Sequence, residues 1–249
     1  MPSQGVLFIA TGEKYIRSAI RSAISIRKYC PDLPIHLFAN WKELGFHFEP
    51  DPYPFYSVDE IKNPHRRSKV DYMQHTPFDY TLFLDTDTAF NADIRDMFRL
   101  LERFDIAATH AHRRKAPVRM QPWRIQIPHA FPQYNAGVLL FRKTEAVMQL
   151  MKDWSQAFRE AGFPQDQITL RELLWLSDLR IATLPPEYNV RFLKYHYLWD
   201  KTEASTQIFH LRKYHDGPLW LYRAFVRFVR KIFSDFGIDI RAWVPKKND

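Results

Sequence analysis

Cysteine is almost absent from this sequence of 249 residues, since Cys30 is the single example. One cysteine cannot form an internal disulfide, which fits a reducing compartment. The N-terminus lacks a basic segment followed by an apolar core, so we expect no signal peptide. No apolar run reaches the length of a membrane span. Together these absences predict a cytoplasmic protein.

Glycine is also scarce, with 7 residues against 17 prolines, while aromatic residues make up 16% of the chain. This composition argues against a repetitive or low-complexity chain, and its 46% hydrophobic residues can form a globular core. The first turn lacks a G-x-G-x-x-G pattern, which counts against a dinucleotide-binding fold of the dehydrogenase type. The net charge of +8 favours anionic partners, namely nucleotides, nucleic acid or an acidic membrane surface.

Short apolar segments alternate with amphipathic ones along the chain. The opening reads as a strand at 6–10, a helix at 15–29 and a strand at 35–39. Such a β-α-β unit predicts an α/β fold with a mostly parallel sheet flanked by helices. Further strands are expected at 80–84, 105–109, 135–141, 181–184 and 207–210, and further helices at 66–74, 94–101, 144–161 and 167–176.

Two carboxylates, Asp85 and Asp87, follow the apolar strand 80–84. Side chains alternate along an extended chain, so both point to the same side and repel each other unless a cation lies between them. Mg²⁺ or Mn²⁺ would suit such a site and keep positions open for a phosphorylated ligand. Ligands of open α/β sheets bind beyond the carboxyl ends of the strands. A polar turn that closes the strand is the alternative for this short motif alone.

Other candidate site residues lie at the ends of expected elements. Asn135 offers both a donor and an acceptor, and Gly137 allows close approach of the backbone. Asp166 suits a helix N-cap, or a carboxylate that faces the site. Tyr15 could stack on a nucleobase, or it could pack on the core where its helix starts.

Basic residues gather in three segments. Arg66, Arg67 and Lys69 precede the strand 80–84 and suit contact with a diphosphate or sugar, although a solvated basic face is the alternative. Residues 110–134 form a long Pro-, Arg- and His-rich segment that we interpret as a lid or an acceptor-side loop. Its basic residues are Arg113, Arg114, Lys115, Arg119 and Arg124.

The third basic segment, 220–236, has the pattern of an amphipathic helix with a basic stripe and a broad apolar face. Such a helix can lie on an anionic membrane surface at the inner face of the membrane. The alternative is a closing helix that packs on the preceding domain.

Several short elements occur in an order that resembles the metal-dependent nucleotide-sugar glycosyltransferases of the GT-A fold, in particular family 8, the group of glycogenin and bacterial galactosyltransferases. The elements are Thr11 to Tyr15, Lys69, Asp85-Thr86-Asp87, Asn135-Ala136-Gly137-Val138, Asp166-Gln167, Leu184-Pro185-Pro186-Glu187-Tyr188-Asn189 and His210. The likeness spans roughly residues 5 to 215. We therefore expect a catalytic domain at 1–215 and a basic amphipathic segment at 216–249.

The resemblance implies a hexosyltransferase that uses a nucleotide-diphosphate sugar, with a UDP-hexose as the family default. Asp85, Asp87 and His210 would hold the metal, Mn²⁺ or Mg²⁺, and Asp85 would also contact the donor. For the donor, the resemblance implies contacts from Thr11, Tyr15 and Lys69. For catalysis on the sugar and acceptor side, it implies Asn135, Asp166 and Gln167. The acceptor would be a saccharide or glycolipid, and nucleic acid is not an expected partner.

The chain departs from the family after the late histidine. The family pattern there is H-x-x-G-x-x-K, whereas His210 is followed by Leu211-Arg212-Lys213-Tyr214-His215-Asp216. Lys213 or Arg212 would then replace the family's phosphate-binding lysine.

Two other functions are compatible with parts of the pattern. An apolar strand that ends in D-x-D also resembles phosphohydrolases of the haloacid dehalogenase type, although their motif lies near the N-terminus. A non-catalytic basic protein that binds membrane or nucleic acid would use the net charge but leaves the paired aspartates unexplained.

Overall fold

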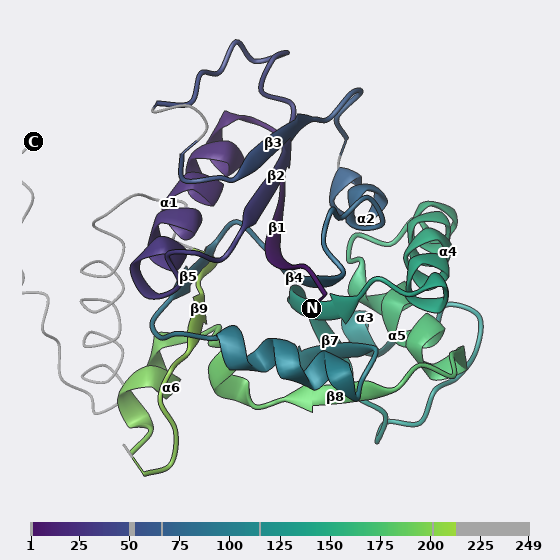
Figure 1. Cartoon of the computed structure of the whole chain (residues 1–249). Coiled ribbons are helices and arrows are strands. Elements are labelled where there is room, and N and C mark those ends of the chain that lie inside the picture. Colours follow the sequence, from purple (N-terminus) through teal and green to yellow (C-terminus); the bar gives the residue numbers. More distant parts are fainter. Residues whose placement is uncertain (1, 50–52, 66, 115, 201, 213–249) are drawn as a thin grey trace, which may run out of the picture.

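The computed structural model describes residues 2–49, 53–65, 67–114, 116–200 and 202–212 (Figure 1). The expected segment 216–249, with its basic helix at 220–236, and the candidate Lys213 lie outside the described residues. Among the described residues, no helix combines the length and the apolar character that crossing a membrane requires.

A central sheet of seven strands organises the fold, in the order β3-β2-β1-β4-β7-β6-β8. Its strands are β1 (Gln4–Ala10), β2 (Ile35–Ala39), β3 (Ser57–Glu60), β4 (Tyr80–Leu84), β6 (Ile106–His110), β7 (Tyr134–Arg142) and β8 (Ile181–Leu184). All neighbouring pairs are parallel except those of β7, which runs antiparallel to both β4 and β6. The prediction of a mostly parallel α/β sheet is therefore confirmed.

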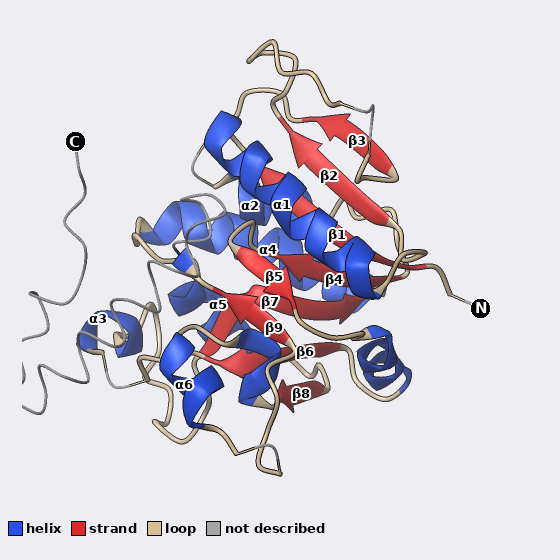
Figure 2. Ribbon diagram, turned by 90° about the vertical axis from the view of Figure 1, so that its left-hand side faces the viewer, coloured by secondary structure: helices blue, strands red, loops and turns tan. Residues whose placement is uncertain are grey.

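Helices cover both faces of the sheet (Figures 1 and 2). They are α1 (Glu13–Tyr29), α2 (Ser68–Met73), the 3₁₀ helix η1 (Arg95–Glu102), α3 (Pro117–Met120), α4 (Glu145–Ala161), α5 (Gln167–Leu176), the 3₁₀ turn η2 (Pro186–Asn189) and α6 (Leu193–Leu198). Along β1, Val6 and Phe8 join the core under α1 and η1, whereas Leu7 and Ile9 join the core under α2, α4 and α5. This alternation explains why the strand is apolar at every position.

Two further strands, β5 (Thr88–Phe90) and β9 (Ile208–His210), form a small antiparallel ribbon outside the central sheet. The expected strand at 207–210 is thus present, but it belongs to this ribbon. Thr88 pairs with His210, so the ribbon brings the late histidine to the residues that follow β4. The register of this ribbon is what assembles the candidate site.

The structure corrects several expectations about secondary structure. The strands β3 and β5 and the helix α6 were not predicted, because each is six residues or shorter and shows no clear period. The expected α-helix at 94–101 is the 3₁₀ helix η1. The expected loop 110–134 contains the short helix α3.

Candidate functional site

Three side chains that the sequence places far apart meet beyond the carboxyl end of β4. His210 Nε2 lies 3.1 Å from Asp87 Oδ1 and 3.4 Å from Asp85 Oδ2. One ligand atom from each of the three residues lies within 4.8 Å of the others. Asp85 is held there by its backbone amide, which donates to the Gly137 carbonyl of β7 over 2.8 Å.

The electrostatics of this cluster fit a divalent cation. His210 is 1% exposed, and its Nε2 has no hydrogen-bond partner within the described part of the chain. Its other ring nitrogen, Nδ1, lies 2.8 Å from an amide oxygen and therefore carries the proton of a neutral ring. Nε2 then turns a lone pair toward two carboxylates, which is unfavourable unless a cation or a second proton lies between them. Two carboxylate oxygens and one imidazole nitrogen suit a divalent metal ion.

Lys69, on α2, connects the group of Asp85, Asp87 and His210 to a third carboxylate, that of Asp166. Its Nζ lies 2.8 Å from Asp85 Oδ1 and 3.2 Å from Asp166 Oδ2. Burial alone lowers the pKa of Lys69, but Asp166 and Asp85 outweigh it and raise that pKa, so the side chain stays charged. Burial likewise raises the pKa of Asp85, yet that pKa lies well below its usual range, and the charge of Lys69 is the largest cause that lowers it.

Asp166 precedes α5, as an N-cap would, but its side chain makes no capping hydrogen bond. Asp166 thus occupies the N-cap position, and its carboxylate faces the site through its ion pair with Lys69.

A cavity of about 320 Å³ opens beside these residues. It brings together five of the predicted residues, namely Lys69, Asp85, Asn135, Asp166 and Gln167. Its other lining residues are His112, Arg113, Arg119, Arg191, Phe192 and Arg212. The cavity is therefore rimmed by arginines, and among them is Arg212, one of the two residues expected to replace the family's lysine.

Thr11 and Tyr15 do not line this cavity but lie at the same edge of the sheet. Phe8 of β1 pairs in parallel with Leu84 of β4, so both strands end on the side of the aspartates. Tyr15, in the first turn of α1, is 47% exposed and does not pack into the core as a buried residue. Its ring is thus accessible to a ligand at this edge.

The long segment 110–134 divides into two parts. Arg113 and Arg119 reach the cavity, while Arg124 pairs with Glu160 on α4 over 2.7 Å and stacks on Trp123. The part around Arg124 is fastened by Glu172, whose Oε2 accepts hydrogen bonds from the backbone amides of residues 123, 124 and 125. Only the first part of the segment can therefore act on a ligand in the cavity.

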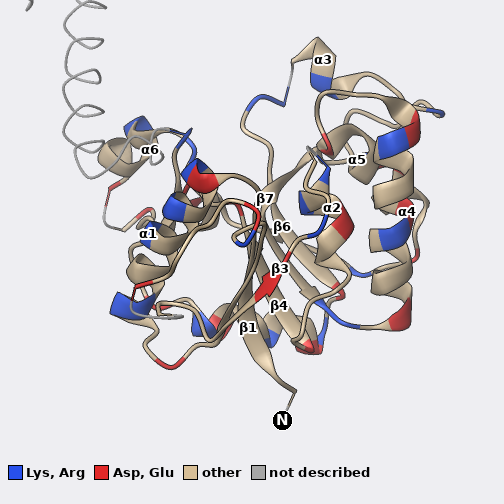
Figure 3. Cartoon of the chain, turned by 90° about the horizontal axis from the view of Figure 1, so that it is seen from above, with Lys and Arg blue, Asp and Glu red and all other residues tan. Residues whose placement is uncertain are grey.

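Sequence reasoning missed several residues of the site. The buried Asn189 closes η2, inside the element Leu184 to Asn189 that had been noted without a role. Arg191 follows two residues later and lines the cavity. Basic residues occur throughout this chain, and Figure 3 shows both charge signs even within α2. Composition alone could not indicate which arginines face the cavity.

The fold and the paired aspartates together define a GT-A type α/β protein. A model of the nucleotide-diphospho-sugar transferase family matches residues 79–215, which is more than half of the sequence. The chain belongs to this family, and it is a glycosyltransferase. Compared by sequence, it matches no curated protein.

Three solved structures show the same fold. The chain is similar to galactosyltransferase LgtC, determined in complex with donor and acceptor sugar analogs, with 14% identity, a TM-score of 0.59 and coverage of 86% of this chain and 87% of LgtC. It is also similar to mouse xyloside xylosyltransferase 1 in its apo form, with 13% identity and a TM-score of 0.57, and the match covers 86% of this chain and 99% of the xylosyltransferase. A third similar structure is the glycosyltransferase GlyE of Streptococcus pneumoniae TIGR4, with 16% identity and a TM-score of 0.56, and the match covers 99% of this chain and 66% of GlyE. At these identities the likeness concerns the fold.

Proposed function

We propose that this glycosyltransferase moves a hexose from a UDP-sugar to a saccharide or glycolipid acceptor, and that it requires a divalent cation, Mn²⁺ or Mg²⁺. The observation that carries the proposal is the approach of Asp85, Asp87 and His210, whose ligand atoms all lie within 4.8 Å of one another. These three residues would hold the ion. When bound, the ion would act as a Lewis acid on the donor diphosphate.

The reaction would break the bond between the sugar C1 and the diphosphate oxygen and form a bond from C1 to the oxygen of an acceptor hydroxyl, whose proton passes to the leaving diphosphate or to solvent. Negative charge therefore builds on the leaving diphosphate. Lys69 and the cavity arginines, of which Arg191 and Arg212 follow η2 and β9, are cations fixed beside the aspartates. Preorganised cations of this kind stabilise the transition state in proportion to the charge that develops there.

The sugar and the nucleotide would occupy different parts of the edge. Asn135, Asp166 and Gln167 line the cavity, so we assign the donor sugar to them. Thr11 and the accessible ring of Tyr15 would bind the uridine, at the carboxyl end of β1. Lys213, which lies outside the described residues, stays a candidate for the diphosphate beside Arg212.

An adjoining cavity of about 280 Å³ is suited to the acceptor. It shares His112 with the first cavity, and its wall includes Tyr195 and Trp199, whose rings stack with centroids 5.9 Å apart. Thr109 Oγ1 and His110 Nδ1 on the same wall are buried and lack hydrogen-bond partners among the described residues. Aromatic faces and free polar atoms suit a saccharide, which has apolar C–H faces and hydroxyl edges.

The basic segment 220–236 supports a proposal about location. Its sequence suits binding to anionic lipids at the cytoplasmic face of a membrane, which would bring the enzyme to a glycolipid acceptor. Deletion of residues 220–249 should release the protein from vesicles that contain anionic lipid. Undiminished vesicle binding by the truncated protein would refute this location.

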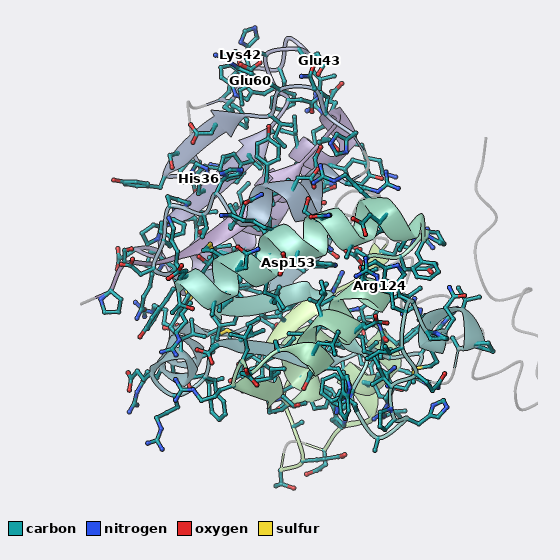
Figure 4. All side chains as sticks on the ribbon, turned by 90° about the vertical axis from the view of Figure 1, so that its right-hand side faces the viewer. His36, Lys42, Glu43, Glu60, Arg124 and Asp153 are labelled. Carbon is teal, nitrogen blue, oxygen red and sulfur yellow. The ribbon has the colours of Figure 1, made fainter. Side chains whose placement is uncertain are left out.

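A thermal-shift screen of nucleotide sugars, with and without Mn²⁺, tests the proposed function. A ligand that binds only the folded state raises the melting temperature by mass action. We expect one UDP-hexose to raise it in the presence of Mn²⁺, and we expect Asp85→Ala/Asp87→Ala to lose that shift. Asp153→Ala, on the exposed face of α4 (Figure 4), is the matched control and should keep it.

The family match favours this function over the phosphohydrolase and the non-catalytic alternatives. If no nucleotide sugar stabilises a protein that folds and binds Mn²⁺, the proposed donor class is wrong. Hydrolysis of simple phosphate esters by that protein would then support the phosphohydrolase.

A further inference from the structure

Asn189 is a buried amide with no exposed surface, at the end of η2. It belongs to the element Leu184 to Asn189 and lines the adjoining cavity of about 280 Å³, but it does not line the cavity beside Asp85. Instead its side chain lies between two residues of the candidate site, Asn135 and His210. Asn135 and His210 are themselves 5% and 1% exposed, so water does not compete for these contacts.

The direction of every hydrogen bond in this group follows from one backbone amide. The N–H of Gly137 can only donate, and it lies 2.9 Å from Asn135 Oδ1, which is therefore the acceptor. Asn189 faces that same oxygen at 3.1 Å and must present its NH₂ group there. Its Oδ1 is thereby turned toward His210.

The orientation of the amide in turn determines the tautomer of the imidazole. His210 Nδ1 lies 2.8 Å from Asn189 Oδ1, and this contact is a hydrogen bond only if Nδ1 carries a proton. In a neutral ring Nε2 is then unprotonated, and it is the nitrogen that faces Asp85 and Asp87. Partners of this kind commonly orient metal-binding histidines and raise the affinity for the metal.

We propose that Asn189 is a positioning residue that holds His210 in the Nδ1–H tautomer, with Nε2 presented to a divalent cation. The proposal rests on the function proposed above, because it assumes that Asp85, Asp87 and His210 bind that cation. Asn189 also lines the adjoining cavity that we assign to the acceptor, so its effect on His210 is measured with Mn²⁺ alone, without donor or acceptor. Its two hydrogen bonds require an acceptor on one side and a donor on the other, which an asparagine side chain supplies in a single group.

Mn²⁺ affinity, measured by electron paramagnetic resonance titration of the folded protein, separates this role from simple packing. Asn189→Leu keeps the shape but removes both hydrogen bonds, and we expect its Kd for Mn²⁺ to rise roughly 10- to 100-fold. Asn189→Asp keeps the acceptor for Nδ1–H and should retain an affinity closer to wild type. Asn91→Leu is the control, since it removes a single hydrogen bond to the Thr206 carbonyl and should not change the Kd.

Nitrogen NMR of ¹⁵N-histidine-labelled protein, saturated with diamagnetic Mg²⁺, gives a second and independent readout. We expect the ¹⁵N shifts of His210 in the wild type to show a proton on Nδ1. In Asn189→Leu we expect the ¹⁵N shifts of His210 to indicate that Nδ1 no longer carries the proton in every molecule. The wild-type spectrum alone remains decisive if the leucine variant does not fold.

Two results would overturn the proposal: a proton on Nε2 in the wild type, or unchanged Mn²⁺ affinity in folded Asn189→Leu. Failure of the proposed metal site looks different, because then the wild type itself would bind no Mn²⁺, and failure of the proposed donor class leaves Mn²⁺ binding and its dependence on Asn189 in place. A proton on Nδ1 of the metal-free wild type at alkaline pH would still support the hydrogen-bond direction in that case.

Discussion

Gly137 packs directly against His210, so closely that a Cβ atom at position 137 would overlap ring atom Cε1. The same Cβ would also collide with the Asp85 carboxylate. The glycine of the Asn135-Ala136-Gly137 element therefore makes room for the side chains of Asp85 and His210. Close approach, rather than an unusual backbone angle, explains its place in β7.

Gly137→Ala should displace His210 and Asp85 and raise the Kd for Mn²⁺ at least tenfold. Electron paramagnetic resonance titration measures this change. Gly162→Ala is the matched control, because Gly162 has a φ of 64° with no atom near its missing Cβ. That control should lower the free energy of unfolding by about 1 kcal/mol and leave Mn²⁺ binding intact.

Lys69→Met should separate donor binding from metal binding. The variant removes the cation between Asp85 and Asp166, which leaves more negative charge beside the metal ligands. We expect Mn²⁺ to bind at least as tightly as in the wild type, while the Kd for the UDP-sugar rises tenfold or more. Calorimetric titrations of both ligands check this, with the exposed Lys152→Met as the control. Parallel losses of both affinities would show that Lys69 is only structural.

Because of Asp105, the free energy of unfolding should fall as the pH is lowered into the acid range. Its Oδ2 accepts from the Arg180 backbone amide at 2.7 Å, and its Oδ1 accepts from Arg142 Nε at 2.7 Å. Burial raises the pKa of Asp105, but these hydrogen bonds outweigh it and lower that pKa. A lowered folded pKa adds stability above the unfolded value of about 3.9, and this stability is lost as the pH falls through the folded pKa.

Asp105→Asn should therefore cost about 2 kcal/mol at pH 7 and show a smaller loss of stability below about pH 4 than the wild type. Urea unfolding from pH 2 to pH 7 measures both effects. Asp153→Asn, an exposed change on α4, should match the wild type. Equal acid sensitivity in Asp105→Asn and the wild type would assign the acid transition to other carboxylates.

Glu172→Ala should loosen the segment that leads away from the cavity. The Glu172 carboxylate is buried and accepts from three successive backbone amides, at 3.3, 3.0 and 3.3 Å. Its loss should speed hydrogen exchange at residues 123–125 by roughly tenfold or more, since buried N–H groups lose their partner. Glu160→Ala removes an exposed ion pair with Arg124 and an exposed hydrogen bond from Gln156, and it should leave that exchange unchanged.

How much of this could be predicted from the sequence depends on the kind of contact. The strands 35–39, 80–84 and 181–184 agree with β2, β4 and β8, because local apolar pattern determines them. The approach of His210 to the aspartates depends on the pairing of β5 with β9, and three-residue strands carry almost no local signal. Family resemblance, rather than periodicity, indicated that approach.

The role of Asn189 illustrates a second limit. An asparagine after a Pro-Pro turn is ordinary in composition, and its importance arises from two hydrogen bonds over separations of 54 and 21 residues. Asp166 shows the reverse case, since local sequence allowed a helix cap while the distant Lys69 decides where its carboxylate points. Long-range polar contacts of this kind require the three-dimensional structure.

Calorimetric titration of UDP into the protein, with Mn²⁺ and again after chelation, tests the central claim most directly. We predict that the wild type binds UDP with Mn²⁺ and loses most of that affinity without it, and that Asp85→Ala/Asp87→Ala does not respond to Mn²⁺. Equal UDP affinity with and without Mn²⁺ in the wild type, or a Mn²⁺ response that survives in the double variant, would contradict a metal-bridged nucleotide site at Asp85, Asp87 and His210.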